Sequence, residues 1–376
     1  MKIVVAPDSF KGSLSAKEVG LTIQEAFLRE IPGAEVVVVP MADGGEGTLD
    51  ALLFATNGEK ISAVVTGPLG EQVTTVYGIL GDGKTAVIEM AQVAGLPMVP
   101  DSKRNPSQTT TYGVGELILA ALEKGIRSFI IGLGGSATND GGLGMLQALG
   151  ATFLDKAGSP VKPVGAALQE IASVDFTDTY PALKESKFTV ASDVENPLCG
   201  ENGATFVFGP QKGATVTQLQ QLDDGMAKYA RLVEAQLGIK MQSVPGAGAA
   251  GGLGFGFLVL GAEIQSGAQV VAEATCLEAQ IRQADWVITG EGQSDFQTLY
   301  GKAPFYVAQL AKRYGVGTIL ISGGLGPGHE QLLDHFVSCH AVVNSPMPLQ
   351  QAIDQAQPLL FSCARNIARI VRAGVS

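Results

Sequence analysis

Short glycine-rich segments that also carry hydroxyl, carboxylate or lysine side chains recur along this chain of 376 residues. Such segments suit the joint binding of phosphate and magnesium, because close backbone N–H groups contact phosphate oxygens and carboxylates supply the hard oxygen ligands that magnesium prefers. None has the Gly-Lys-Ser/Thr ending of the common phosphate-binding loop, so an ordinary P-loop NTPase is not expected. The segments span residues 8–13, 42–48, 132–142 and 289–295. Residues 246–254 are added for their glycines, although they carry none of those side chains, and residues 192–198 (SDVENPL) for their polar residues beyond a predicted strand.

Two of these segments follow a predicted apolar strand and precede a predicted helix, which is where open α/β sheets bind ligands. Residues 132–142 follow a strand expected at 129–133, and residues 289–295 follow one expected at 286–289. For both segments, a functional role is favoured over a merely structural turn. Lys302 comes shortly after the second segment and could reach a phosphate as a point charge or simply cap a turn.

The other segments keep two interpretations. Gly44 and Gly45 could form only a tight turn before a helix that begins near Thr48. The glycines of residues 246–254 could let backbones pack closely as readily as they could bind phosphate. Asp193 could begin a turn, yet an acidic residue just beyond a strand is also where a catalytic base or metal ligand would be placed.

The chain has three histidines, His329, His335 and His340, and all of them lie late in the sequence. A hydrolase triad or a histidine-ligated catalytic metal would be difficult to assemble from them. Phosphoryl transfer needs no histidine, because it relies on positioning, magnesium, cationic side chains and a carboxylate that orients the attacking hydroxyl. The residue types of the glycine-rich segments therefore fit phosphoryl transfer better than hydrolysis.

Composition narrows the class further. Only 16% of the residues are charged and the net charge is −11, which argues against a nucleic-acid partner. The apolar runs are shorter than the roughly 18 to 20 residues that a membrane helix needs. A cytoplasmic protein is expected because the N-terminal residues lack a secretory signal. Neither a disulfide nor a zinc site is predicted, since the cysteines stand singly at Cys199, Cys276, Cys339 and Cys363.

Apolar strands that alternate with helices predict an α/β protein of two domains. The strands that carry this pattern are expected at residues 2–6, 35–39, 286–289, 318–322 and 341–343. Both termini are therefore predicted to form one Rossmann-like parallel-sheet domain, residues 1–65 plus 281–376, and residues 66–280 an inserted second α/β domain. Within the insertion, strands at 73–80 and 85–89 are expected to pair as a hairpin.

Taken in order, several segments resemble the type-1 glycerate kinases, the family that includes bacterial glycerate 2-kinases. They are residues 6–12 (APDSFKG), 41–48 (MADGGEGT), 134–142 (GGSATNDGG), 192–198 (SDVENPL) and 289–292 (TGEG). The resemblance spans nearly the whole chain and implies a Rossmann-like domain beside a second α/β domain. It also implies a kinase that uses ATP and Mg²⁺ to phosphorylate D-glycerate, leaning to 2-phosphoglycerate as product, in glycerate, glyoxylate and sugar-acid catabolism.

The resemblance and the loop chemistry together suggest roles. Asp193 is expected to orient or deprotonate the glycerate hydroxyl, while Lys11 and Lys302 neutralise the charge that develops during transfer. The expected magnesium ligands are Asp43, Asp140, Glu291 and Asp295. The residues expected to bind the substrate or the nucleotide are Asp8, Ser9, Gly44, Gly45, Gly134, Gly135, Ser136, Thr138, Asn139, Asn196, Gly248, Gly251, Gly252 and Gly290.

Several alternatives stay open from the sequence. A glycerate kinase that forms 3-phosphoglycerate, or an enzyme for another hydroxy acid such as tartronate, would use the same residue types. A nucleotide-dependent dehydrogenase would need a Gly-x-Gly-x-x-Gly turn after the first strand, which residues 8–12 do not provide. A non-catalytic binding protein for a small acid is disfavoured, because such proteins are usually exported and no secretory signal is recognised at the N-terminal residues. No nucleic-acid or membrane partner is expected, and a homodimer remains open.

Overall fold

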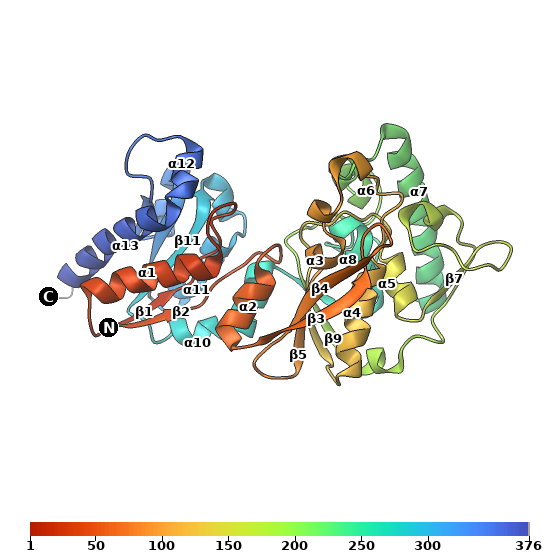
Figure 1. Cartoon of the computed structure of the whole chain (residues 1–376), viewed down its shortest axis with the longest axis horizontal. Coiled ribbons are helices and arrows are strands. Elements are labelled where there is room, and N and C mark those ends of the chain that lie inside the picture. Colours follow the sequence, from red (N-terminus) through yellow and green to blue (C-terminus); the bar gives the residue numbers. More distant parts are fainter. Residues whose placement is uncertain (375–376) are drawn as a thin grey trace. The chain divides into compact units, whose positions relative to one another are not determined.

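The computed structural model describes residues 1–374, which form two compact units. Unit 1 comprises Met1–Asp43, Asp50–Asn57 and the C-terminal part of the chain from Ser266, whereas unit 2 comprises Gly44–Leu49 and Gly58–Gln265. Within the described range, no helix combines the length and the apolar character needed to cross a bilayer. Both units mix helices with parallel strands, so the predicted α/β class is confirmed (Figure 1).

Unit 1 is built on a five-stranded, wholly parallel sheet in the order β13-β12-β11-β1-β2. Its strands are β1 (Lys2–Val5), β2 (Glu35–Val38), β11 (Trp286–Ser294), β12 (Gly317–Leu325) and β13 (Ser338–Ala341). The chain steps from β1 to β2 in one direction and from β11 to β13 in the other, so the strand order reverses between β1 and β11. Open parallel sheets bind ligands beyond the carboxyl ends of their strands at such a reversal.

Helices cover both faces of this sheet. On one face, α1 (Ala16–Glu30) and α13 (Ala356–Ala373) contact each other and bury apolar side chains against Ile319 and Ile321 of β12 (Figure 1). Leu320 lies between those two residues and points to the opposite face, where it packs with Ala308 of α11 (Ala303–Arg313). The remaining helices of this unit are α9 (Gly267–Ala274), α10 (Leu277–Ile281) and α12 (Leu349–Asp354), together with most of α2 (Thr48–Thr56).

Unit 2 contains a six-stranded mixed sheet in the order β10-β9-β6-β5-β4-β3. The strands are β3 (Glu59–Thr66), β4 (Gln72–Ile79), β5 (Thr85–Glu89), β6 (Ser128–Gly132), β9 (Lys187–Ala191) and β10 (Glu263–Gln265), and β7 (Thr152–Leu154) pairs separately with β8 (Ser173–Asp175). From β5 to β10 the strands are parallel, so their carboxyl ends meet at one edge. The helices are α3 (Ala91–Ala94), α4 (Tyr112–Glu123), α5 (Leu143–Ala148), α6 (Ala204–Phe208), α7 (Val216–Leu237) and α8 (Ala249–Val259).

Several local predictions can be compared with these elements. The hairpin of β4 and β5 is confirmed by their antiparallel pairing. Residues 349–373 form two helices, α12 and α13, because Pro358 has no N–H to donate to the carbonyl of Asp354 and its ring would clash there. The strand expected at 341–343 lies earlier, at Ser338–Ala341, and residues 329–334 form a 3₁₀ helix.

Close backbone packing in unit 2 predicts a specific stability effect. Gly251 has φ +68°, and a Cβ there would lie 1.9 Å from the carbonyl oxygen of Thr138, whereas Gly158 has φ +78° and open space around it. Gly251→Ala should therefore destabilise the folded chain by about 1–3 kcal/mol more than Gly158→Ala, which shares only the left-handed strain. Thermal unfolding followed by circular dichroism measures the difference. Equal shifts for the two variants would contradict the packing explanation.

Candidate active site

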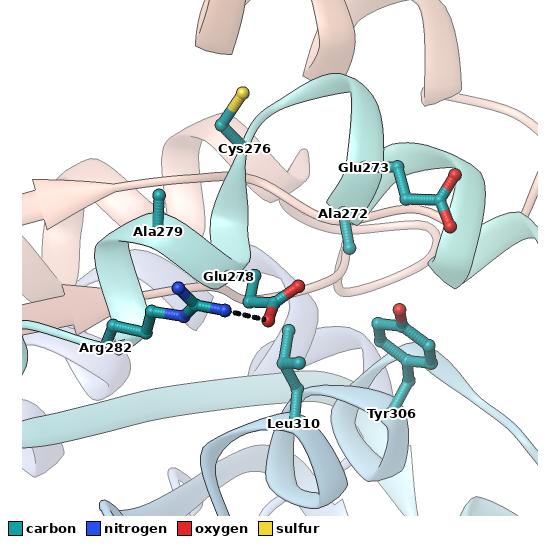
Figure 2. Close-up of a pocket in the computed structure, with 8 residues that line it drawn as sticks. All are labelled: Ala272, Glu273, Cys276, Glu278, Ala279, Arg282, Tyr306 and Leu310. Carbon is teal, nitrogen blue, oxygen red and sulfur yellow. Dashed lines mark hydrogen bonds and ion pairs between the residues drawn. The ribbon is translucent and has the colours of Figure 1, made fainter. Parts of the chain in front are cut away.

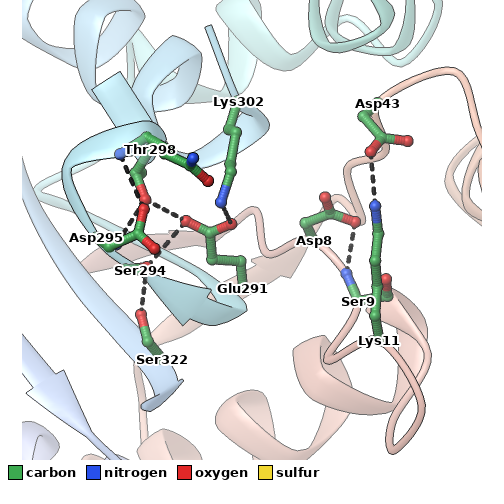
Figure 3. Close-up of polar contacts among 11 residues, drawn as sticks. Asp8, Ser9, Lys11, Asp43, Glu291, Ser294, Asp295, Thr298, Lys302 and Ser322 are labelled. Atoms are coloured by element: carbon green, nitrogen blue, oxygen red, sulfur yellow. Dashed lines mark hydrogen bonds and ion pairs between the residues drawn. The ribbon is translucent and has the colours of Figure 1, made fainter. Parts of the chain in front are cut away.

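The reversal of strand order in unit 1 brings acidic and basic side chains together. Asp8 follows β1, and its backbone N–H donates to the carbonyl of Gly290 in β11 at 2.8 Å, so the two strand ends stay paired beyond β1. Asp43 follows β2, and Lys11 contacts its Oδ2 through Nζ at 2.8 Å (Figure 3). We call Asp8, Asp43 and Glu291 the carboxylate cluster.

The surroundings of Asp8 strongly alter its protonation. Its side chain is 9% exposed, and Oδ1 accepts the backbone N–H of Ser9 at 2.6 Å. Burial, followed by the negative charge of Asp43, raises the pKa of Asp8 to about 7, although Lys11 and the hydrogen bond from Ser9 act in the opposite direction. A carboxyl group with this pKa can accept or release a proton near neutral pH.

Glu291 is held by a set of donors that the sequence did not reveal. Its Oε1 accepts hydrogen bonds from Ser294 at 2.9 Å and from Thr298 at 2.7 Å, and its Oε2 pairs with Nζ of Lys302 at 3.1 Å. Ser294 in turn shares a 2.6 Å hydrogen bond with Ser322 of β12 (Figure 3). This network fixes the position of Glu291 and, through it, that of Lys302.

The donor set of the cluster fits magnesium in the way that phosphate-transferring enzymes usually bind it. Residues 1–374 contain no group of three or more Asp, Glu, His or Cys side chains placed to hold a metal by themselves. Mg²⁺ commonly takes only one or two carboxylates and keeps water and substrate phosphates as its other ligands. Asp43 and Asp8 could supply those carboxylates. Asp295 is already engaged, because Oδ1 caps the short helix after it by accepting the N–H of Gln297 at 2.8 Å.

In unit 2, glycines let loops meet at the carboxyl ends of β6 and β9. The N–H of Gly134 donates to the carbonyl of Gly44 at 3.3 Å. A Cβ on Gly44, which has φ +84°, would lie 2.5 Å from the carbonyl oxygen of Ala191, and a Cβ on Gly134 would lie 2.6 Å from Cα of Gly45. Side chains at these positions would push the two loops apart. The contact thus joins two of the sequence segments expected to bind ligands.

The rest of the Gly134–Gly142 loop is buried and strongly bonded. Asp140 is fully buried, and its carboxylate accepts hydrogen bonds from the N–H and hydroxyl groups of Thr111 and from the N–H groups of Gly142 and Gly144. Asn139 donates to Oγ1 of Thr205 at 3.0 Å. Although those hydrogen bonds lower the pKa of Asp140, burial outweighs them and raises it. Asp140 therefore organises the loop, and its oxygens are already used.

The glycine run before and within α8 packs against other backbone. The N–H of Gly248 donates to the carbonyl of Asn196 at 2.9 Å, and the carbonyl of Gly251 accepts the N–H of Gly141 at 3.0 Å. Gly252 has φ +87°, and a Cβ there would lie 2.8 Å from Cα of Gly141. These contacts favour the packing interpretation of this run over direct phosphate binding.

Asp193 lies two residues beyond the end of β9, and its side chain is exposed. The residues predicted to form the site fall into two groups, each inside one unit of the structure. Asp8, Ser9, Lys11, Asp43, Gly290, Glu291, Asp295 and Lys302 belong to unit 1, whereas Gly44, Gly45, the residues of the Gly134–Asp140 loop, Asp193, Asn196, Gly248, Gly251 and Gly252 belong to unit 2.

Among the buried charged residues of unit 2 that the sequence prediction missed, Lys212 and Glu89 lie beside the predicted segments. Lys212 is 2% exposed, and its Nζ donates to Oγ of Ser136 and to the carbonyl of Thr138, both at 2.7 Å. Glu89 is 2% exposed and accepts the N–H of Leu49 at 2.7 Å, in the first turn of α2. The position of Lys212 between two glycines, in the sequence Gly-Pro-Gln-Lys-Gly, was the one available signal.

A separate pocket in unit 1 contains none of the predicted residues. It lies among α9, α10 and α11, and Arg282 pairs inside it with Glu278 at 3.0 Å (Figure 2). The residues that line it are Ala272, Glu273, Cys276, Glu278, Ala279, Arg282, Tyr306 and Leu310. Its lining contains neither a lysine nor a glycine-rich segment, the groups that we expect to contact phosphate, so we assign no phosphoryl transfer to this pocket.

Comparison with known proteins identifies the family. Residues 3–372 match the model of the glycerate kinase family. The chain belongs to the glycerate kinase family. A glycerate kinase of Halalkalibacterium halodurans is 47% identical over 97% of both chains, and the glycerate 2-kinase of Escherichia coli K12 is 47% identical over 100% of this chain and 99% of its own. The crystal structure of a candidate glycerate kinase 2 from Salmonella typhimurium LT2 superposes with a TM-score of 0.92 at 44% identity, covering 100% of this chain and 99% of that one.

These similarities confirm the family resemblance and the expectation that the chain is an enzyme. The roles of the individual residues stay predictions. They can be tested separately from the family, because each residue's surroundings are now known.

The charge of Asp43 should control the protonation of Asp8. Asp43→Asn removes the second-largest cause of the raised pKa of Asp8, so that pKa should fall below about 7. Burial remains, which should keep it above the 3.8 of an unperturbed aspartate. NMR titration of the Asp8 carboxyl carbon measures the change. Asp295→Asn is the matched control, because Asp295 is not among the groups that shift Asp8; an unchanged pKa in Asp43→Asn would refute the coupling.

Proposed function

We propose that the protein transfers the terminal phosphoryl group of ATP to the 2-hydroxyl of D-glycerate, giving 2-phosphoglycerate and ADP. The carrying observation is the similarity over the whole chain to glycerate kinases, among them the E. coli glycerate 2-kinase. The carboxylate cluster with its two lysines supports the same chemistry, because phosphoryl transfer needs metal-binding oxygens, positive charge and a carboxylate near the attacking hydroxyl.

Each group has a proposed task. Asp193 accepts the proton of the glycerate hydroxyl while that hydroxyl oxygen forms a bond to the γ-phosphorus of ATP. At the same time, the bond from the γ-phosphorus to the bridging oxygen of ADP breaks. Lys11 and Lys302 offset the charge on the transferring phosphoryl group. Asp43 with Asp8 would hold magnesium, which supplies charge neutralisation between the phosphates when bound. Glu291 acts on Lys302 rather than on the metal, since its oxygens already accept three hydrogen bonds.

The loops of unit 2 are proposed to bind the anionic groups of the substrates. Gly135, Ser136, Thr138 and Asn139 present N–H and hydroxyl groups, and Gly44 and Gly45 hold that loop in place by close backbone contact with Gly134. We place the reaction in the cytoplasm, in the breakdown of glycerate and related acids. The unpaired thiols of Cys199, Cys276, Cys339 and Cys363 are consistent with a reducing compartment.

The product identifies the hydroxyl that is phosphorylated. Purified protein with ATP, Mg²⁺ and D-glycerate should form ADP and a product that enolase alone converts, because enolase acts on 2-phosphoglycerate. A signal that appears only when phosphoglycerate mutase is added would mean phosphorylation at the 3-hydroxyl. No ADP with D-glycerate, but ADP with tartronate, would replace the proposed acceptor with another hydroxy acid.

Asp193→Asn should lower kcat by about 10²-fold or more, because the amide cannot accept the hydroxyl proton. The KM for ATP should change little, since the proposed role of Asp193 concerns glycerate. Asp178→Asn is a suitable control, because Asp178 is an exposed acid of the same unit outside the predicted site. Retention of most turnover by Asp193→Asn would remove Asp193 from the role and leave Asp8 as the next candidate base.

A further inference from the structure

Lys212 is an unusual lysine because it is buried without a carboxylate partner. It ends a short 3₁₀ helix, Pro210–Lys212, and the following Gly213 has φ +91° and approaches the carbonyl of Arg104 so closely that a Cβ would lie 2.4 Å from it. Within residues 1–374 no Asp or Glu oxygen lies in ion-pair distance of Nζ. Burial lowers the pKa of Lys212 to about 7, while the more distant charge of Asp140 opposes this shift.

Two of the three N–H bonds of the Lys212 ammonium are accounted for. One donates to Oγ of Ser136 and another to the carbonyl of Thr138, both at 2.7 Å. The third has no acceptor among the described residues. An uncompensated ammonium in a protein interior is costly, so a site that keeps one has either a structural need for it or a negatively charged ligand.

The neighbouring loop offers further donors without acceptors. The N–H groups of Gly134 and Ala137 bond to other backbone, yet those of Gly135, Ser136, Thr138 and Asn139 donate to no atom in the described part of the chain. Ser136, Thr138 and Asn139 are nonetheless buried. Buried backbone N–H groups are nearly always paired, so unpaired ones concentrated in one loop indicate a ligand or ordered water.

We propose that Lys212 and these N–H groups form an oxyanion site that binds an anionic group of a substrate. Both substrates of the proposed reaction carry one: the nucleotide has phosphates and glycerate has a carboxylate. A chain with a net charge of −11 must attract anions through local donors, and a lysine without a carboxylate partner is free to pair with a ligand. This inference rests on the proposed function only for the identity of the anion, because binding can be measured without turnover.

The decisive measurement is calorimetric binding of three probes, Mg·ADP, inorganic phosphate and D-glycerate, to wild type and to Lys212→Met. Loss of a charge-assisted hydrogen bond should weaken binding on the order of tenfold to hundredfold. Weaker binding of Mg·ADP or phosphate alone would assign the site to the nucleotide, and weaker binding of glycerate alone to the acceptor. Unchanged affinity for all three would overturn the proposal. Lys162→Met, at an exposed lysine of the same unit, is the matched control.

Lys212→Gln separates ligand binding from a structural role. Its amide can still donate to Ser136 and Thr138 but carries no charge, so it keeps the loop contacts if Lys212→Met should fail to fold. Wild-type affinity in Lys212→Gln would show that Lys212 only positions the loop, and would also overturn the proposal. Partial recovery in Lys212→Arg would support the charge requirement. If the wild-type protein binds Mg·ADP more tightly than Lys212→Met does but forms no phosphoglycerate, the proposed function would be refuted while the anion site would stand.

Discussion

The parallel pairing of β1 with β11 is the constraint on which unit 1 depends. It joins the first residues of the chain to a strand that begins at Trp286, with Ile3, Val4 and Val5 in register with Trp286, Val287 and Ile288. All of unit 2 is therefore an excursion between two neighbouring strands of one sheet. Because the strand order reverses at this pair, Asp8, just beyond β1, and Glu291, in the carboxyl-terminal half of β11, belong to the position where such sheets bind ligands. Loss of the β1–β11 contact would remove that geometry.

Burial of Asp8 beside other negative charges, chiefly that of Asp43, opposes folding. Asp8 keeps its proton to a higher pH in the folded chain than in the unfolded chain, so this carboxyl makes the folded state less stable as the pH rises from about 3.8 toward about 7. The oxygens of Glu291, by contrast, accept hydrogen bonds from three side-chain donors. A buried carboxyl with a raised pKa, such as Asp8, is typical of residues whose protonation serves function.

Features that depend on local sequence pattern could be predicted from the sequence. Apolar strands followed by glycine and polar residues predicted the α/β class, and the ordered segments from Asp8 to Gly292 resembled the right family. Lys212 and Glu89 could not be found this way, since their burial depends on segments distant in the chain that approach only after folding. The glycines of α8 show the same limit: whether Gly251 contacts ligand or backbone is decided by the position of Thr138, more than a hundred residues earlier.

Lys11, Lys302 and Lys212 differ in how easily they can exchange their present partner for a ligand. This difference suggests different roles for them. The Lys11 side chain is 71% exposed, and an exposed ion pair contributes at most about 1 kcal/mol, so Lys11 can leave Asp43 for a phosphate at little cost. Lys302 is less exposed and pairs with a Glu291 that is fixed by two hydroxyls. Lys212 cannot move without breaking the loop that it holds. Lys11 is an adaptable cation beside a carboxylate that we propose to bind magnesium, so it can follow a phosphoryl group during transfer. Lys212 is a fixed cation beside a loop rich in donors, so it can only hold a group that stays in place.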